Sequence, residues 1–390
     1  MQQRRVWAEI DLDAMTANLR RIRFLAGNKR VMAIVKANAY GHGAVPIAWH
    51  LASLGVAALG VGDSQEAIEL RRAGISIPIL VLGAVVPGEL PAVVAHDIAV
   101  TVHSSERVRL LGREARRAAR PTSVHLKIDT GMGRLGCAPG RAVDIARLIT
   151  RAEFLSFDGL CTHFSAAGPG QEEFTARQIA IFEEVSHAIE HAGIELPPRH
   201  AANTAALLTR AADHLDVVRP GLALYGIAPD PGLRDGLTPA LTLKSQIIFL
   251  KDHAAGSPIG YERTHVTSRR TRIATLPVGY HDGYAFRLGG KAEVLVRGQR
   301  APVVGRVSMD YLTVDVGHVA GARVGDEVTL LGPGLDAREL ADRAGTIPYE
   351  VFTRLGNRVE RVYHGGRSGP ERGFSVVSRP GVVRQTPTRR

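Results

Sequence analysis

A lysine that follows a short apolar segment is the first residue of this chain whose setting favours covalent chemistry. Lys36 comes after AIV (33–35) and before ANAYGHG (37–43), whose glycines allow a flat ligand to approach the backbone. A lysine leaving a buried strand is partly desolvated, and its lowered pKa favours the neutral amine that forms Schiff bases. A solvated loop lysine is the alternative, although only six of the 49 basic residues are lysines.

A glycine-rich loop further along the chain indicates a carboxylate site. In LKIDTGMGRLG (126–136), three glycines shape a loop that presents Arg134. An arginine holds a carboxylate through two parallel hydrogen bonds, so an amino-acid substrate is a natural ligand. A plain turn with one exposed arginine is an equal alternative. In the segment before the loop, Lys127 lies near Asp129 and needs a neutralised or paired charge.

Polar residues also follow three later apolar segments. They are His163, Asn203, Thr204, Arg219 and Gly221. Each alone is more often structural, but together they fall at the same predicted end of a parallel sheet as Lys36 and Arg134. Backbone N–H groups near Thr204 and Gly221, with hydroxyls of Thr204 and Tyr40, predict a phosphate site.

A repeating arrangement of strands and helices must position these residues. Eight short apolar segments alternate with stretches of helical period, among them the amphipathic segment 172–191. Buried strands joined by helices predict an α/β fold with a parallel sheet, and eight of them predict a closed (β/α)₈ barrel of the TIM type. An open doubly wound sheet is the alternative. The predicted strands are 31–35, 56–62, 78–82, 98–102, 123–128, 157–161, 199–203 and 216–220.

The pattern changes after a turn-rich segment at 228–239. Strand-like segments follow with few helices between them, which predicts a mostly β C-terminal domain. Two short helices are predicted near 336–344 and at 348–355. The strand-like segments are 245–250, 271–278, 292–298, 301–309, 311–316 and 327–332.

The domain organisation predicted from these patterns has three parts. A barrel covers residues 8–236, a β domain covers 237–366 and is joined by residues 1–7, and a basic, disordered tail covers 367–390. Six arginines and one glutamate give this tail +5 of the formal net charge of +11. The charge therefore indicates a solvated terminus rather than a nucleic-acid groove, and an aromatic content of 5% argues against base-stacking platforms.

The remaining composition bounds the class of protein. Cys137 and Cys161 are too few for a disulfide framework and fit a reducing compartment. No stretch approaches the ~20 apolar residues of a membrane span, and the N-terminal sequence lacks the apolar run of a signal peptide. We therefore expect a cytoplasmic protein.

Six motifs, in this order, resemble those of the alanine racemases over about residues 7–363. They are AIVKANAYGHG, KIDTGMGRLG, VRPGLALYG, GYERT, GRVSMD and IPYE. The resemblance implies a (β/α)₈ barrel followed by a β domain, pyridoxal 5'-phosphate as cofactor, and a homodimer in which the second domain of one subunit caps the barrel of the other. It implies an isomerase that interconverts L- and D-alanine for bacterial cell-wall peptidoglycan, with no metal, nucleic-acid or membrane partner.

The resemblance also implies the two catalytic residues. Lys36 binds the cofactor as a Schiff base and handles the α-proton of the D-enantiomer, while Tyr261 of the partner subunit handles that of the L-enantiomer. His163 and Arg219 favour the phenolate by charge and hydrogen bonding. Arg219 faces the pyridine nitrogen, which it cannot protonate, and His200 steadies Arg219 from behind.

Other roles are implied in the same way. The cofactor phosphate is held by Tyr40, Thr204, Gly221, Leu222 and Tyr349, with His163 and Asn203 also near the cofactor. Arg134 and the backbone of Met309 from the other subunit meet the substrate carboxylate. Lys127 matches a position that is carbamylated in some relatives, Tyr280 lines the access path, and Asp310 supports the site.

Three positions depart from the commonest pattern of that family. His265 stands where tyrosine is frequent, Thr204 where serine is frequent, and Ser308 where cysteine is frequent. The alternatives are a broad-specificity or serine racemase of the same fold, a decarboxylase that uses the same cofactor, and a cofactor-binding protein without turnover. Decarboxylases of this fold place an acid, not an arginine, beside the pyridine nitrogen.

Overall fold

The structure is a computed structural model that describes residues 4–209, 215–233, 236–366, 374–375 and 384–385. Within these residues the chain forms two compact units. One comprises residues 15–39 and 43–238, and the other comprises the residues up to 14, the loop 40–42 and the residues from 239 onward. We call them the barrel unit and the β unit.

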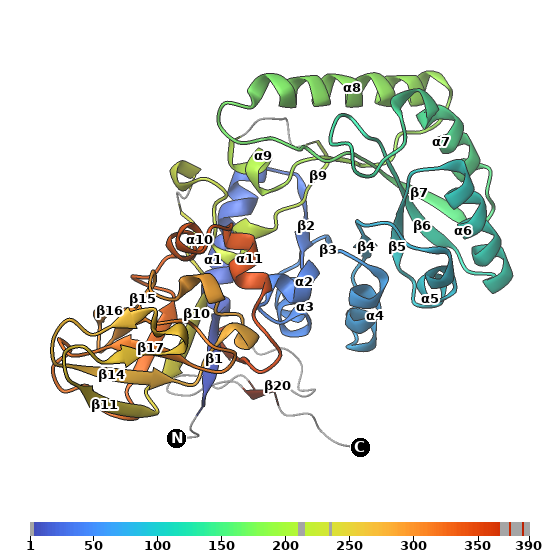
Figure 1. Cartoon of the computed structure of the whole chain (residues 1–390). Helices are drawn as coiled ribbons and strands as arrows, with labels where there is room; N and C mark the ends of the chain where they lie inside the picture. Colours follow the sequence, from blue (N-terminus) through green and yellow to red (C-terminus); the bar gives the residue numbers. More distant parts are fainter. Residues whose placement is uncertain (1–3, 210–214, 234–235, 367–373, 376–383, 386–390) are drawn as a thin grey trace, which may run out of the picture. The chain divides into compact units, whose positions relative to one another are not determined.

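Eight parallel strands build the barrel unit, as the sequence predicts (Figure 1). They follow one another in chain order from β2 to β8, and β9 lies beside β2. Two backbone hydrogen bonds join the segments of β8 and β9, from Asp216 N to Arg199 O (3.0 Å) and from Arg219 N to Ala202 O (2.8 Å). The order and these bonds describe a nearly closed barrel, not an open doubly wound sheet. The strands are β2 (Arg30–Ile34), β3 (Ala58–Val61), β4 (Ile79–Val81), β5 (Ala99–Val102), β6 (Thr122–Lys127), β7 (Leu155–Cys161), β8 (Arg199–His200) and β9 (Val217–Val218).

Helices follow the strands of the barrel, and Figure 1 shows α4 to α7 outside them. Asp63 and Ser104 cap α4 and α6 by accepting backbone hydrogen bonds from Glu66 N (2.9 Å) and Arg107 N (3.2 Å). The predicted face of α8 is confirmed, since Phe182, Val185 and Ile189 are buried. The helices are α1 (Leu12–Ala26), α3 (Ala44–Ser53), α4 (Ser64–Arg72), α5 (Leu90–Ala95), α6 (Ser105–Ala118), α7 (Ala142–Thr150), α8 (Glu172–His191) and α9 (Thr204–Thr209).

A nine-stranded sheet dominates the β unit, in the order β11-β14-β17-β16-β15-β18-β10-β1-β19. All neighbours are antiparallel except β1 and β19, which are parallel. The mostly β character predicted for this region is confirmed. The strands are β1 (Val6–Asp11), β10 (Leu241–Gln246), β11 (Phe249–His253), β14 (Thr271–Leu276), β15 (Glu293–Val296), β16 (Gln299–Val304), β17 (Leu312–Asp315), β18 (Glu327–Leu331) and β19 (Glu360–His364), and a separate hairpin joins β12 (Pro258–Ile259) to β13 (His265–Val266).

The sequence-based boundaries differ from these units at the N-terminus. We predict that the barrel begins at residue 8, whereas β1 pairs along Val6–Asp11 with β10 and β19 of the β unit. The predicted strand 245–250 is also two strands, because the chain changes partners at Ile247 and Ile248. Ile247 N donates to Asp326 O and Ile248 N donates to Thr275 O, next to β18 and within β14 respectively.

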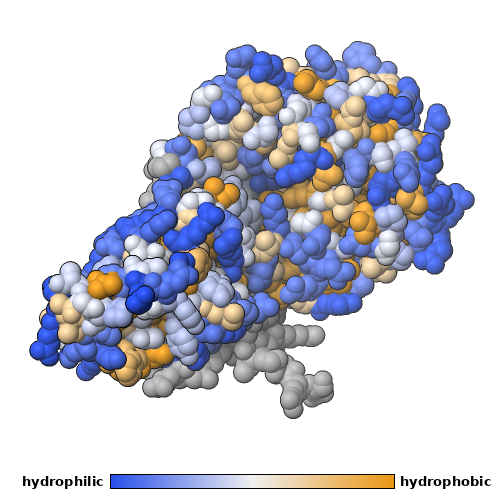
Figure 2. Space-filling view, viewed as in Figure 1, coloured by the Kyte–Doolittle hydropathy of each residue, from blue (hydrophilic) through white to orange (hydrophobic). Residues whose placement is uncertain are grey.

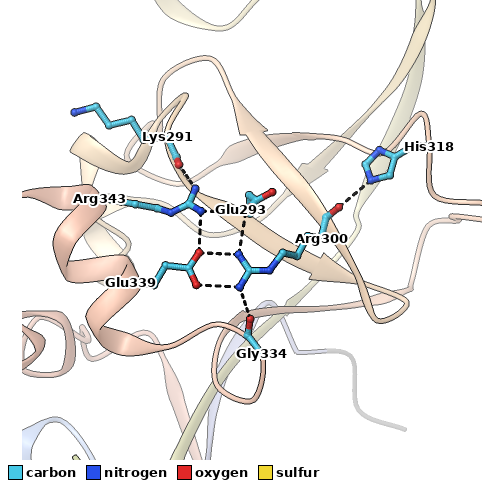
Figure 3. Close-up of polar contacts among 7 residues, drawn as sticks. All are labelled: Lys291, Glu293, Arg300, His318, Gly334, Glu339 and Arg343. Carbon is cyan, nitrogen blue, oxygen red and sulfur yellow. Dashed lines mark hydrogen bonds and ion pairs between the residues drawn. The ribbon is translucent and has the colours of Figure 1, made fainter. Parts of the chain in front are cut away.

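An ion-pair network ties α10 (Ala337–Ala344) to the hairpin of β15 and β16 (Figure 3). Glu339 on α10 accepts two hydrogen bonds from Arg300, at 2.7 and 2.9 Å, and one from Arg343 at 2.8 Å. Glu293 on β15 bonds to the same two arginines at 2.9 and 3.0 Å. The two carboxylates and two guanidinium groups therefore alternate in one cluster. A second helix, α11 (Pro348–Thr353), follows, as predicted.

Most of the predicted basic tail, 367–390, lies outside the described residues. Its two described pieces, β20 (Phe374–Ser375) and β21 (Arg384–Gln385), pair in antiparallel fashion. In the view of Figure 2, hydrophobic side chains on the surface of the β unit lie scattered among hydrophilic ones. Across the described residues, no helix has the length and apolar character needed to traverse a bilayer.

We expect Glu339→Gln to destabilise the β unit by about 1 kcal/mol or less, the usual range for partly exposed ion pairs. A hydrogen bond from Arg300 lowers the pKa of Glu339 below its ordinary value of 4.5. The stabilisation is therefore present above that value and is lost as the pH falls through the lowered pKa. Thermal unfolding of the parent and the variant should differ at pH 7 and converge in acid. The same difference for Asp342→Asn, an exposed acid on α10, would contradict this assignment.

Candidate active site

Lys36 begins a left-handed turn at the carboxyl end of β2. The element α2 (Lys36–Tyr40) contains four consecutive non-glycine residues, 37–40, with φ between 51° and 53°. This conformation costs about 1–2 kcal/mol per residue, so the surroundings must enforce it. Ala37 N donates to Glu66 Oε1 (2.5 Å), and Asn38 Oδ1 accepts from Ala44 N (2.7 Å). These bonds fix the direction in which the lysine leaves the strand.

The environment of Lys36 favours its neutral amine. The side chain is accessible to solvent, yet the surrounding protein removes part of the hydration of its ammonium group, and this desolvation lowers the pKa of Lys36. The positive charge of Arg134 lowers it further, whereas the carboxylate of Glu66 raises it. A neutral amine is the nucleophile that reacts with carbonyl carbon.

Asp129 shapes the loop that presents Arg134. Its carboxylate accepts backbone hydrogen bonds from Gly131 (3.0 Å), Met132 (3.0 Å) and Gly133 (3.1 Å). Burial opposes ionisation of this carboxyl group, but the three hydrogen bonds outweigh it and lower the pKa of Asp129. Arg134 itself is exposed and has no ion pair in the described part of the chain. Its guanidinium is therefore available to an anionic ligand.

Arg219 lies buried in the barrel, with 5% of its surface exposed. NH1 contacts His200 Nδ1 (2.6 Å) and donates to the His200 carbonyl (2.6 Å). NH2 donates to the carbonyls of Thr162 (2.8 Å) and Ala201 (3.0 Å) and contacts His163 Nδ1 (3.1 Å). Every hydrogen bond of Arg219 within the described residues uses NH1 or NH2, which leaves Nε–H for a ligand acceptor.

The contacts of Arg219 define the state of its two histidine neighbours. A guanidinium has no acceptor, and the two hydrogens of NH1 match the carbonyl and Nδ1 of His200, so this Nδ1 accepts and the neutral His200 ring carries its proton on Nε2. NH2 has two hydrogens for three neighbouring acceptors, of which His163 Nδ1 is the most distant. Burial, followed by the charge of Arg219, lowers the pKa of both histidines well below 6.5. We predict from the resemblance that His163, with Arg219, assists by charge and hydrogen bonding, and the lowered pKa favours the neutral form of His163.

Lys127 is a buried cation without a carboxylate partner among the described residues. Its Nζ donates to the carbonyl of Leu82 (3.3 Å). Burial lowers the pKa of Lys127, Cys161 opposes the shift, and the charges of Arg219, Arg134 and Lys36 add to it. The same three cations and Lys127 act on His163. These five residues thus lie close enough for their charges to act on one another.

Thr204 and the segment after Arg219 are joined by backbone N–H groups that donate to the Thr204 hydroxyl oxygen. Thr204 Oγ1 accepts from Gly221 N (2.9 Å) and Ala223 N (3.4 Å), and Leu222 begins the 3₁₀ helix η3 (Leu222–Tyr225). The hydroxyl hydrogen of Thr204 remains for a ligand oxygen. Asn203 is used differently, because its Oδ1 accepts from Ala206 N (3.0 Å) at the start of α9 and its Nδ2 donates to Phe164 O (3.2 Å).

The other predicted site residues belong to the β unit. Tyr261 lies in η5 (Tyr261–Arg263), between β12 and β13, with 71% of its surface exposed. Glu262 and Arg263 both have positive φ, and Glu262 forms an ion pair with Arg306. The departure from the family pattern, His265, pairs with Ile259 across the hairpin. Most of the Tyr261 side chain is therefore open to solvent in this chain.

Two further loops of the β unit hold the remaining predicted residues. Tyr280, which begins η6 (Tyr280–Asp282), donates its backbone N–H to Ser308 O (3.0 Å), so it lies beside Met309. Met309 is half exposed, and Asp310 binds Arg358 (2.7 Å).

Elsewhere in the same unit, the rings of Tyr40 and Tyr349 lie 6.1 Å apart. Both tyrosines are predicted phosphate ligands. Burial raises the pKa of Tyr349, which keeps its hydroxyl protonated and able to donate.

Sequence reasoning missed two residues near this site. Glu66 accepts from Ala37 N and from Gly62 N (2.7 Å), and its charge acts on Lys36. Glu66 lies three residues after the helix cap Asp63, which is the spacing of an ordinary helix-capping motif, so the sequence does not distinguish it as a site residue. His125 contacts His200 from within β6, and only its polarity in an apolar strand marked it.

Comparisons with known proteins agree over nearly the whole chain. The family model "Alanine racemase, N-terminal domain" matches residues 10–229, and "Alanine racemase, C-terminal domain" matches residues 240–363. An alanine racemase of Symbiobacterium thermophilum is 44% identical over 368 residues, covering 93% of this chain and 98% of the relative.

Two solved structures extend this likeness. The alanine racemase of D-cycloserine-producing Streptomyces lavendulae is 38% identical, with a TM-score of 0.89 over 94% of this chain and 99% of that one. The alanine racemase of Bartonella henselae, with covalently bound pyridoxal phosphate, is 28% identical, with a TM-score of 0.83 over 92% and 99% of the two chains.

We expect Glu66→Gln to lower the pKa of Lys36 further, because removing a nearby negative charge disfavours the ammonium form. Modification of Lys36 by an amine-specific reagent, followed by peptide mass spectrometry across a pH series, measures this shift. The profile should move to lower pH. Glu69→Gln, an exposed acid on the same helix, is the matched control. An unchanged profile in Glu66→Gln would exclude Glu66 from control of the lysine.

Proposed function

We propose that this chain, which belongs to the alanine racemase family, holds pyridoxal phosphate at the carboxyl end of its barrel and uses Lys36 and Tyr261 as opposed bases. The family makes it an isomerase that depends on this cofactor. The observation that carries the site assignment is the convergence of Lys36, Arg134 and Arg219 at one end of the barrel.

The residues present suit such a cofactor. When bound, pyridoxal phosphate supplies an electron sink for the charge that develops as the α-proton of an amino acid leaves. Lys36 offers a partly desolvated amine to its aldehyde. The backbone N–H of Leu222 and the hydroxyl of Thr204 offer donors to its phosphate, and Gly221, whose own N–H donates to Thr204 Oγ1, holds that hydroxyl in place. On this proposal, Tyr40, Tyr349 and Asn203 also contribute to the cofactor site.

Arg219 sets the electronic character of the site. Its unused Nε–H suits an acceptor such as the pyridine nitrogen, and a guanidinium cannot transfer its proton there at neutral pH. The ring nitrogen then stays unprotonated, so charge withdrawal is weaker than beside an acid. This favours simple return of the proton to the α-carbon over transamination or decarboxylation. The buried position of Arg219 thus argues against the decarboxylase alternative.

Racemisation requires proton removal on one face of the α-carbon and proton return on the other. Lys36 serves the face of the D-enantiomer, and Tyr261 serves the face of the L-enantiomer. Arg134, with the backbone of Met309, holds the substrate carboxylate and so presents the Cα–H bond to both bases. His163, with Arg219, stabilises the phenolate that acts as base.

We propose that the protein is a homodimer in which Tyr261 of one subunit contributes to the site on the barrel of the other. The support is that Tyr261 and Met309, which the resemblance places in the partner's site, are themselves exposed large side chains of the β unit, as is Ile347 beside the predicted phosphate ligand Tyr349. The exposed fractions of their surfaces are 71% for Tyr261, 58% for Ile347 and 52% for Met309. Tyr280 and Asp310 lie in the same loops as Met309 and would line the shared site. Such an enzyme supplies D-alanine for peptidoglycan from the cytoplasm.

Two inactive variants test both bases and the dimer. We expect Lys36→Ala to lose the visible absorbance of bound cofactor and all racemisation. Tyr261→Phe should keep the absorbance and slow α-proton exchange from L-alanine by about 10²–10⁴-fold, the usual value of a general base. Exchange at the parent rate in Tyr261→Phe would remove this tyrosine from the mechanism.

Mixing these two variants locates the second base. If each site combines Lys36 of one subunit with Tyr261 of the other, every mixed dimer contains one native site. After subunit exchange, the mixture should regain about a quarter of the parent activity, because half of the dimers are mixed and half of their sites are native. If both bases belong to one subunit, no site is native and the mixture stays inactive.

A second prediction concerns Lys127, which we propose to be carbamylated. Its neutral amine nitrogen bonds to the carbon of CO₂ and releases one proton to solvent, and the resulting anion orients Arg134. Nuclear magnetic resonance with ¹³C-bicarbonate should show one carbamate signal that is absent in Lys127→Ala and lost on acidification. Removal of CO₂ should raise the KM for alanine. No such signal in the parent protein would contradict the modification.

A further inference from the structure

A chain of hydrogen bonds extends from Arg219 toward the amino end of the barrel. Beyond His200, the next member is His125, whose Nδ1 lies 2.8 Å from His200 Nε2, with the two rings nearly edge-on. His125 and His200 both line a cavity of about 330 Å³. This cavity is bordered by residues at the amino ends of the strands, such as Arg30, Ala58 and Ala99. The chain therefore continues on the side of the barrel opposite the proposed cofactor site.

The direction of this chain is fixed at one end. Arg219 can only donate, so His200 Nδ1 accepts and His200 Nε2 carries the proton. His200 Nε2 then donates to His125 Nδ1, which must be unprotonated. Burial lowers the pKa of His125 to about 4, with Asp158 opposing the shift, so His125 is a neutral acceptor at neutral pH.

The strand structure makes room for this imidazole. The pairing of β6 and β7 shifts register between Val124 and His125, which makes Asp158 an extra residue and sets His125 against Gly159. A Cβ at Gly159 would lie 2.0 Å from His125 Nδ1. Any residue other than glycine would displace the ring. The bulge and the glycine are thus two independent features that seat one histidine.

We propose that His125 is a positioning residue for the racemase reaction: by accepting from His200 it fixes the tautomer and orientation of His200, and through it the placement of Arg219 toward the cofactor ring. This inference rests on the proposed function, because Arg219 must face the pyridine nitrogen. His125 lines the cavity at the amino ends of the strands and acts on the cofactor site only through His200.

Binding of pyridoxal phosphate and of one analogue distinguishes the positioning role of His125 from a general loss of packing. Apoprotein is titrated with pyridoxal phosphate and with its 1-deaza analogue, in which carbon replaces the ring nitrogen. We expect His125→Leu to weaken binding of pyridoxal phosphate about tenfold more than binding of the analogue, the equivalent of one hydrogen bond. His125→Asn, whose Oδ1 can replace the Nδ1 acceptor, should recover most of this difference. His187→Leu, an exposed histidine on α8, is the matched control.

A second measurement reads the tautomer directly. In ¹⁵N-histidine-labelled apoprotein, the two ring nitrogens of His200 should show protonated Nε2 and unprotonated Nδ1 in the parent and in His125→Asn. In His125→Leu this pattern should be lost or average with the other tautomer. An equal loss of affinity for both ligands, or an unchanged His200 spectrum in His125→Leu, overturns the positioning role. Failure of the parent itself to bind pyridoxal phosphate would instead refute the proposed function.

Discussion

The burial of one guanidinium group dictates much of the chemistry of this barrel. Removing a charge from water costs several kcal/mol, so a buried cation persists only when its donors are satisfied. Arg219 meets this requirement with backbone carbonyls of Thr162, His200 and Ala201 and with two imidazole nitrogens. No carboxylate pairs with it among the described residues. Burial lowers the pKa of His163, His200 and Lys127, and the positive charge of Arg219 lowers each of them further.

The carboxyl end of the barrel consequently combines positive potential with neutral bases. Two guanidinium groups, Arg219 and Arg134, lie there, while the pKa values of His163, His200 and Lys36 are lowered toward the neutral forms. A dianionic phosphate and a substrate carboxylate fit such a field, and a neutral lysine fits covalent capture of an aldehyde. A single arginine in the core therefore influences both the charge of the ligands that suit the site and the protonation of the groups that act as nucleophile or base.

Local periodicity is enough to predict most of the fold. The eight barrel strands are short apolar segments and the helix 172–191 shows its buried face, because burial leaves a period in the sequence. Residues 1–7 are predicted to join the β domain, but the extent of β1 to Asp11 cannot be found this way, since its partners begin more than 200 residues later. The left-handed turn at 37–40 is equally hidden, because none of its residues is glycine.

Some residues of the site can be predicted from the sequence pattern and others cannot. Lys36 and Arg134 can be predicted because parallel strands bring their carboxyl ends together. Tyr261 came only from the family resemblance, since a tyrosine in a β hairpin usually signals packing. His125 escaped notice because a hydrogen-bond partner on another strand leaves no mark in the sequence around it.

The pairing of β1 has a consequence for how the polypeptide is made. β1 has no partner strand until β10, which begins at Leu241, and β19, which ends at His364, have been synthesised. All eight barrel strands are synthesised before β10. The barrel strands can therefore pair with one another while both edges of β1 are still unpaired. A nascent chain that stalls before residue 360 has no parallel neighbour for this strand, and the unpaired backbone of β1 is then open to pairing with another chain.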